Sequence, residues 1–140
     1  MTIAPFHLAF PILSIADTEA FYCGVLGCKK ARQSNHWIDF NFFGHQLSAH
    51  VHDGSADSEP TSTVDGKAVP LRHFGVVLPW GEWESLAERL RTQGCTFDLA
   101  PSVRFEGKAG EQGTFFIRDP SGNALEFKAL RDPTQLFSTA

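Results

Sequence analysis

Residues 119–127 read DPSGNALEF, a turn followed by a strand that carries a single carboxylate. The stretch DPSGN is a dense cluster of turn formers. The apolar residues that begin at Ala124 predict the strand. The carboxylate on this strand, that of Glu126, is costly to bury unless it is paired or binds a cation. The stretch therefore indicates a candidate site at Glu126.

Two histidines occupy matching places on other apolar, strand-like runs. His7 belongs to the run 6–13, and His73 belongs to the run 73–78. Alternation puts each imidazole on the face of its strand opposite the large apolar side chains. Two imidazoles and the Glu126 carboxylate, from separate strands, suit a facial site for a divalent metal. The alternative for His7 is a core histidine that donates to a backbone carbonyl.

The composition is that of one ordinary globular domain. A chain of 140 residues, 42% hydrophobic and 20% charged, buries enough surface to fold without disulfides. Its net charge of −4 and its lack of a Lys/Arg run make nucleic acid and anionic membranes poor partners. No signal peptide and no apolar stretch of about 18 residues is visible. With three cysteines and no C-x-x-C pair, we expect free thiols in a cytoplasmic protein.

The order β-α-β-β-β occurs twice along the chain. Its clearest element is an amphipathic helix in which Trp83, Leu86, Ala87 and Leu90 recur at helical spacing. In the first half the expected elements are a strand over 6–13, a helix over 17–26 and strands over 28–33, 37–43 and 46–52. In the second half they are a strand over 73–78, a helix over 80–93 and strands over 95–99, 113–118 and 124–130.

The repeat sets the boundaries that we expect within one domain of residues 1–140. The first module spans about 5–52 and the second about 71–130. Between them, residues 53–70 are polar and rich in Gly, Ser, Asp and Pro, which indicates a linker or a lid. A second long loop is expected over 101–112, and residues 131–140 are expected to form a C-terminal tail.

The doubled pattern resembles the vicinal oxygen chelate superfamily, which includes glyoxalase I, extradiol dioxygenases and bleomycin-resistance proteins. The segments that carry the resemblance are DPSGNALEFK (119–128), HFGVVL (73–78) and FYCGVLG (21–27). The segments GHQLSAH (44–50) and RFEGKAGEQ (104–112) are most similar to a small subgroup of predicted extradiol-type dioxygenases. The resemblance implies an α+β fold in which two βαβββ modules form a curved, cup-like mixed β-sheet with flanking helices. It also implies that His7, His73 and Glu126 bind a metal.

His50 is a fourth candidate in the first module. When Gly44 is aligned with Gly122, Ser48 corresponds to Glu126, and His50 lies one pleat further on the same face. In glyoxalase I relatives the corresponding strand supplies a fourth ligand, usually Glu, and Ser is a poor ligand. A three-ligand site with His50 as a nearby acid/base, or proton shuttle, therefore fits dioxygenase chemistry better. The alternative is a supporting or surface role for His50.

Two residues of the expected long loop are candidates for substrate binding. Arg104 could hold a substrate carboxylate, and Glu111 could support a residue that touches the substrate or the metal. The alternative for both is salt bridging within the loop.

The expected function is that of a metal-dependent enzyme acting on a small vicinal-diol-like substrate. The resemblance favours an Fe(II) dioxygenase of extradiol type with O2 as co-substrate, although the ligand types also suit Mn, Zn, Ni or Co. One rival is a glyoxalase-type lyase or isomerase that uses Zn or Ni. A second rival is a metal-free small-molecule-binding protein of the bleomycin-resistance kind. The resemblance and the exposed sheet edges also predict a homodimer.

Overall fold

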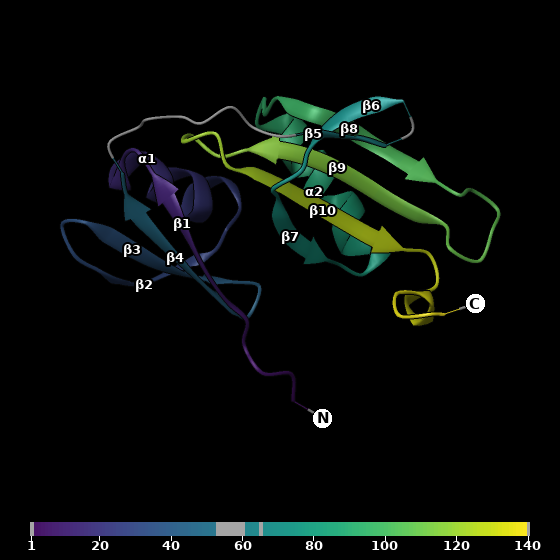
Figure 1. The fold of residues 1–140 in the computed structure, drawn as a ribbon, viewed down its shortest axis with the longest axis horizontal. Coiled ribbons are helices and arrows are strands. Elements are labelled where there is room, and N and C mark those ends of the chain that lie inside the picture. The colour runs from purple at the N-terminus through teal and green to yellow at the C-terminus, as the bar shows by residue number, and fades with distance from the viewer. Residues whose placement is uncertain (1, 53–60, 65, 140) are drawn as a thin grey trace. The chain divides into compact units, whose positions relative to one another are not determined.

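The computed structural model of the chain describes residues 2–52, 61–64 and 66–139. It separates into two compact units (Figure 1). The first takes in residues 1–58 together with 119–123, and the second takes in residues 59–118 together with 124–140. The turn at residues 119–123 thus belongs to the first unit, and the strand that follows it belongs to the second.

The first unit, or first module, is a four-stranded mixed sheet with one helical segment. Its strands lie in the order β1-β4-β3-β2, with β1 parallel to β4 and the other neighbours antiparallel. Its elements are β1 (His7–Ile12), α1 (Ile15–Glu19), a π-helical turn η1 (Ala20–Val25), β2 (Lys29–Gln33), β3 (Trp37–Phe42) and β4 (His45–Val51).

The second unit, or second module, repeats this topology. Its sheet has the order β7-β10-β9-β8, with β7 parallel to β10. Its elements are β7 (Phe74–Val77), α2 (Trp80–Thr92), β8 (Phe97–Arg104), β9 (Gln112–Arg118) and β10 (Ala124–Leu130), followed by the short 3₁₀ helix η2 (Pro133–Gln135). The predicted α+β fold with two βαβββ-like modules is confirmed, each module being a four-stranded mixed sheet.

The helix of the first module begins earlier than its apolar pattern predicts. Ser14 caps it by accepting a hydrogen bond from the Asp17 amide at 3.2 Å, so the helix starts at Ile15 and not at residue 17. Gly27, with φ of 80°, follows the helical segment, whose end lies close to residue 26, where the sequence predicts it. Within it, Tyr22 is fully buried and stacks on Phe40, with ring centroids 5.0 Å apart.

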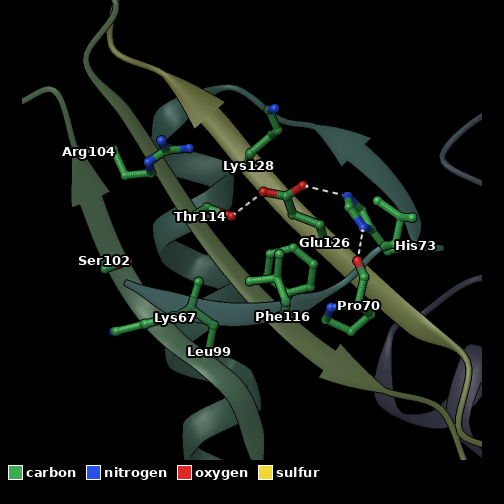
Figure 2. Close-up of a pocket in the computed structure, with 12 residues that line it drawn as sticks. Lys67, Pro70, His73, Leu99, Ser102, Arg104, Thr114, Phe116, Glu126 and Lys128 are labelled. Carbon is green, nitrogen blue, oxygen red and sulfur yellow. Dashed lines mark hydrogen bonds and ion pairs between the residues drawn. The ribbon is translucent and has the colours of Figure 1, made fainter. Parts of the chain in front are cut away.

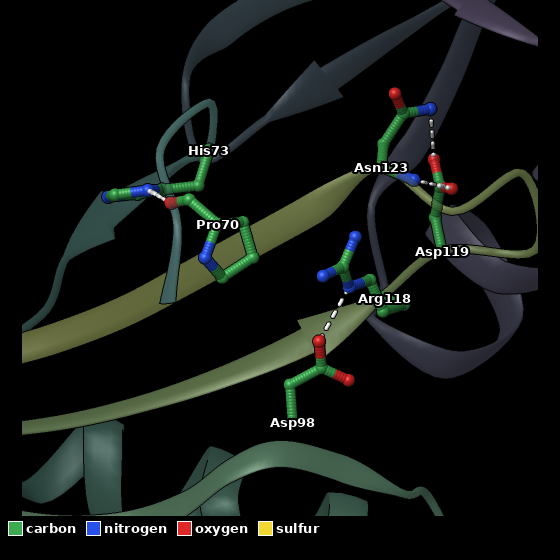
Figure 3. A network of polar contacts seen from close by, with 6 residues as sticks. All are labelled: Pro70, His73, Asp98, Arg118, Asp119 and Asn123. Atoms are coloured by element: carbon green, nitrogen blue, oxygen red, sulfur yellow. Dashed lines mark hydrogen bonds and ion pairs between the residues drawn. The ribbon is translucent and has the colours of Figure 1, made fainter. Parts of the chain in front are cut away.

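The turn at residues 119–123 is organised by one buried carboxylate. Asp119 accepts hydrogen bonds from the amide and the side chain of Asn123, each at 2.9 Å (Figure 3). It also accepts one from the Ser121 amide at 2.9 Å. Its second oxygen also accepts the Tyr22 hydroxyl at 2.9 Å. Burial is the largest cause that raises the pKa of Tyr22, and the neighbouring Asp119 raises it further. The phenol therefore stays protonated and remains a donor. The turn therefore has a structural role set by Asp119.

The second module packs its sheet against one face of α2 through Trp83. Gly113 on β9 leaves room for this ring, because a Cβ there would lie 2.6 Å from it. The Trp83 indole donates to the Phe127 carbonyl at 2.9 Å. Phe127 in turn stacks on Phe115, so the apolar face of β9 and β10 is the one that meets the helix. The opposite face is left for Glu126 and its neighbours.

Gly75 fixes the close approach of β7 to β10. It pairs with Glu126, and a Cβ at this position would lie 1.5 Å from the Glu126 carbonyl oxygen. No other residue type fits there without movement of the backbone. This spacing holds the β7 end of the module beside the strand that bears the carboxylate.

Two segments differ from their sequence-based description. Within the segment expected to be a linker or lid, β5 (Thr61–Val64) and β6 (Lys67–Pro70) form an antiparallel hairpin, while residues 53–60 and 65 lie outside the described residues. The expected loop over 101–112 is shorter, because β8 continues to Arg104. Pro101 is accommodated since β8 is an edge strand whose pairing shifts between Leu99 and Ser102.

The three cysteines, Cys23, Cys28 and Cys95, are free thiols, each partly buried. Among the residues described, none of the helices has the length and apolar character needed to cross a membrane.

Candidate functional site

Glu126 lies on the face of β10 that does not meet α2, and it has two side-chain partners (Figure 2). Thr114, on the adjacent strand β9, donates its hydroxyl to Glu126 Oε2 at 2.5 Å. His73, just before β7, places Nε2 at 3.2 Å from Glu126 Oε1. The side chains of His73 and Glu126 are only 30% and 18% exposed, so water screens this pair poorly. The predicted meeting of His73 with Glu126 is therefore present in the fold.

The other nitrogen of His73 fixes which tautomer the ring adopts. Nδ1 lies 2.7 Å from the Pro70 carbonyl, which can only accept a hydrogen bond, so Nδ1 carries the proton. In a neutral ring, Nε2 then directs a lone pair toward a carboxylate oxygen that also bears lone pairs. That contact becomes favourable when a proton or a metal cation lies at Nε2. The pair thus has the donor chemistry of a cation site.

These residues belong to a pocket of about 250 Å³ in the second module. Its polar part includes His73, Thr114 and Glu126, together with Lys67, Arg104 and Lys128. Its apolar part includes Val69, Leu71, Leu99 and Phe116. The His73 and Phe116 rings meet edge to face, with centroids 5.0 Å apart, which holds the imidazole at the pocket wall.

His7, the candidate ligand of the first module, is oriented by a chain of side chains. Its Nδ1 lies 2.8 Å from Gln46 Oε1. The Gln46 amide nitrogen donates to Asp39 Oδ2 at 3.3 Å, and Ser48 donates its hydroxyl to the other oxygen of Asp39. Because Gln46 turns its NH2 group to the carboxylate, its oxygen faces His7, and His7 Nδ1 is the donor. His7 therefore also keeps its lone pair on Nε2.

Ser48 and His50 lie on the same strand and face as Gln46. In the register of the sheet, Ser48 is opposite Asp39, and it donates its hydroxyl to that carboxylate. His50 is exposed and pairs with Trp37 on β3 and Pro11 on β1. Ser48 thus supports Asp39, while His50 presents an imidazole at the surface of the first module.

The two loop candidates are placed differently. Arg104 ends β8 and lines the pocket, with its guanidinium carbon 4.8 Å from the centre of the Phe105 ring. Glu111 is outside the pocket lining formed by the described residues. It accepts from the Gly107 amide at 3.1 Å and pairs with Arg131 at 3.2 Å. Glu111 therefore shapes the loop after Arg104, as the salt-bridging alternative describes.

Sequence reasoning missed the residues that orient the candidate ligands. Thr114, Gln46 and Asp39 act across strands, and their partners follow from sheet register, which alternation within one strand does not give. Lys128 could have been found, because it lies two residues after Glu126 and so shares its face of β10.

The candidate ligands are divided between the modules, with His7 in the first and His73 and Glu126 in the second. Within residues 2–52, 61–64 and 66–139, no three His, Cys, Asp or Glu side chains are gathered closely enough to hold a metal ion. The donor set nevertheless fits a divalent transition metal, since two Nε2 lone pairs and one carboxylate are of the kind that Fe, Mn, Zn and Ni accept.

Comparison with known proteins identifies the family. Residues 5–127 match the model of the glyoxalase/bleomycin resistance protein/dioxygenase superfamily. A crystal structure of a glyoxalase/bleomycin resistance protein/dioxygenase from Alicyclobacillus acidocaldarius is similar, with 36% identity, 96% coverage of both chains and a TM-score of 0.80. No protein of curated function matched the sequence significantly.

Two solved structures of proteins named for a function share the fold at low identity. The fosfomycin resistance protein FosX from Listeria monocytogenes is 15% identical, with 92% of this chain and 94% of that chain covered and a TM-score of 0.67. Lactoylglutathione lyase from Agrobacterium tumefaciens is 16% identical, with 90% and 92% covered and a TM-score of 0.61. With its doubled βαβββ topology and a family match over most of its length, the chain belongs to the glyoxalase/bleomycin resistance protein/dioxygenase superfamily.

Proposed function

We propose that the chain is a metal-dependent dioxygenase of extradiol type that acts on a small vicinal-diol-like substrate. His7, His73 and Glu126 would hold the metal, Fe(II) being the best candidate. The observation that carries the proposal is the contact between His73 Nε2 and Glu126 Oε1 at 3.2 Å, with Nδ1 already committed to Pro70. The arrangement calls for a cation between an imidazole lone pair and a carboxylate.

A bound Fe(II) would supply open coordination positions for two adjacent substrate oxygens and for O2. The chain's own residues prepare that site. Thr114 holds one oxygen of Glu126, which leaves the other oxygen toward His73. The Pro70 carbonyl keeps the His73 proton on Nδ1. Both ligands of the second module are thus oriented before a metal arrives.

The remaining candidates have roles around the substrate. His50 would accept and return a substrate proton, since its imidazole is exposed at the surface of the first module. Arg104, at the pocket wall, would contact the substrate directly. Glu111 would act indirectly, because its bonds to Gly107 and Arg131 hold the loop that follows Arg104.

The test is elemental analysis of protein purified anaerobically without chelator, compared with Glu126→Ala. About one metal per chain, lost in the variant, is the expected result. Glu88→Ala, which changes a largely exposed carboxylate on α2, is the matched control and should keep the metal. Iron followed by O2 uptake with catechols supports the dioxygenase.

Other outcomes of that analysis contradict the proposal. Zinc or nickel without O2 consumption supports a glyoxalase-type lyase or isomerase. No metal in any of the three proteins, even after reconstitution, supports a metal-free small-molecule-binding protein of the resistance kind.

We also propose that the protein is a homodimer. Each four-stranded sheet ends in two edge strands, and all five residues of the edge strand β2 are exposed. A second copy could cover such an edge. A dimer mass in small-angle scattering is expected, and a monomer mass at the concentrations used for assay would contradict it.

A further inference from the structure

The pocket of the second module is cationic in a chain that is acidic overall. The whole sequence carries a net charge of −4. The pocket lining, by contrast, contains Lys67, Arg104 and Lys128 against one carboxylate, that of Glu126 (Figure 2). Cations gathered in a concave site raise the local concentration of anions. The charge of the pocket lining is thus opposite in sign to that of the whole chain, which indicates an anionic ligand.

Lys128 is the cation placed nearest to the candidate metal ligand in the sequence of β10. It lies one pleat beyond Glu126 on the same face and is opposite Thr114 in the register of the sheet. Among the described residues, none pairs with its ammonium, while Glu126 is already engaged by Thr114 and His73. Lys128 therefore lines the pocket as a cation that no acidic side chain of the described residues pairs with.

The three cations line one pocket and come from separate strands. Lys67 comes from β6, Arg104 from the end of β8 and Lys128 from β10. Phe105 lies against the Arg104 guanidinium, which limits the positions that this planar group can take. A planar, bidentate donor suits a carboxylate or a phosphate, and Lys supplies a point charge beside it.

The rest of the wall is apolar and suits the carbon skeleton of a small molecule. Leu99 and Phe116 line it, with Phe116 held against the His73 ring. A pocket with an apolar wall, a few cations and a candidate metal site can fix the orientation of a ligand by binding its two ends at different places. Vicinal oxygens would meet the metal, and a second polar group would meet the cations.

We propose that the substrate carries an oxyanion, of carboxylate or phosphate type, in addition to its vicinal oxygens, and that Lys128 and Arg104 bind it. This inference rests on the proposed function for the metal end of the substrate only. The anion end depends on the cations of the second module alone. It can therefore be tested without any metal.

The test measures the binding of matched probes to the full chain by calorimetry, with and without added iron. The probes are catechol and 3,4-dihydroxybenzoate, which differ by one carboxylate. We expect the carboxylated probe to bind at least about tenfold more tightly, as one charge-assisted contact allows. The preference should shrink as salt is added and should disappear in the double variant Lys128→Met/Arg104→Met.

Controls separate this proposal from the metal proposal. Lys30→Met, on the exposed strand β2 of the other module, should leave the preference unchanged. Glu126→Ala should lose metal and still prefer the carboxylated probe, so that failure of one proposal does not hide the other. A comparison of phenyl phosphate with benzoate shows which oxyanion the pocket binds more tightly. Tighter binding of either probe than of benzyl alcohol supports the proposal.

Two results would overturn it. One is equal affinity for catechol and 3,4-dihydroxybenzoate in the wild-type chain. The other is a preference that survives in Lys128→Met/Arg104→Met while circular dichroism shows that the variant is folded.

Discussion

The two modules share a strand order but orient their leading histidines by different means. In the second module, His73 donates to a backbone carbonyl, that of Pro70. In the first, His7 donates to the Gln46 side chain, which is itself oriented by Asp39. Both arrangements leave the lone pair on Nε2. The same chemical outcome therefore depends on backbone in one module and on replaceable side chains in the other.

The carboxylates of the two modules also differ in what they face. Glu126 presents an oxygen to His73 and lines a pocket. Asp39, 7% exposed, accepts hydrogen bonds from Ser48 and Gln46 on its two oxygens. A buried carboxylate with neutral donors on both oxygens serves to hold its donors in place. The second module thus offers its carboxylate as a ligand, and the first uses its carboxylate to hold the residue that orients His7.

The largest expected effect comes from Gly75, whose counterpart in the first module is Ala9. Both follow the leading histidine by two residues, but a Cβ at position 75 meets the Glu126 carbonyl oxygen at 1.5 Å. Gly75→Ala must separate β7 from β10, and overpacking of this kind costs about 3 kcal/mol or more in the free energy of unfolding. Urea denaturation measures it. Ala9→Gly, the reverse change, should cost about 1 kcal/mol or less, and equal costs would remove this difference between the modules.

Loss of either leading imidazole should abolish tight metal binding. We expect His73→Ala and His7→Ala each to weaken the affinity for Fe(II) or Zn(II) by more than about 100-fold, since a direct ligand matters more than a supporting residue. Competition with a chelator measures the dissociation constant, and thermal melting of the metal-free proteins checks the fold. His45→Ala tests another histidine of the first module that is no candidate ligand. If His73→Ala keeps both metal content and fold, the ligand assignment fails.

Asp39 should control the tautomer of His7 through the Gln46 side chain, which lies between them. In Asp39→Asn, the new NH2 group can donate to the Gln46 oxygen, which turns the Gln46 NH2 group toward His7 and moves the His7 proton to Nε2. We expect the ¹⁵N shifts of the His7 ring nitrogens to exchange in the metal-free protein at alkaline pH. Metal affinity should fall about tenfold or more.

The controls for Asp39 use the difference between the modules. The His73 nitrogens should keep their shifts, because the Pro70 carbonyl is untouched. Ser48→Ala removes the other donor to Asp39 without touching Gln46, so the His7 tautomer should stay as it is. A His7 spectrum that does not change in Asp39→Asn would show that Gln46 is oriented by something else.

Much of the fold could be predicted from the sequence because its signals are local. Apolar patterning located the strands of the two four-stranded sheets, except that β8 extends to Arg104, and it did not locate β5 and β6; helical spacing located α2, with Trp83 and Leu90 on its buried face. The pairing of His73 with Glu126 was also predictable, from matching places in a repeat. The supporting residues Asp39, Gln46 and Thr114 were not, because their contacts depend on which strands are neighbours and in which register.

The last comparison concerns one buried hydrogen-bond donor on the helical segment of each module. Tyr22 donates to Asp119 in the first module, and Trp83 donates to the Phe127 carbonyl in the second. Tyr22→Phe removes one hydrogen bond, but Asp119 keeps three other donors, so the cost should be about 1 kcal/mol. Trp83→Phe removes the indole N–H that donates to the Phe127 carbonyl, and it also opens space beside Gly113. Its cost should be about 2 kcal/mol or more. Urea midpoints measure both, and a larger loss in Tyr22→Phe would mean that the turn at 119–123 depends on Tyr22 more than on its own backbone bonds.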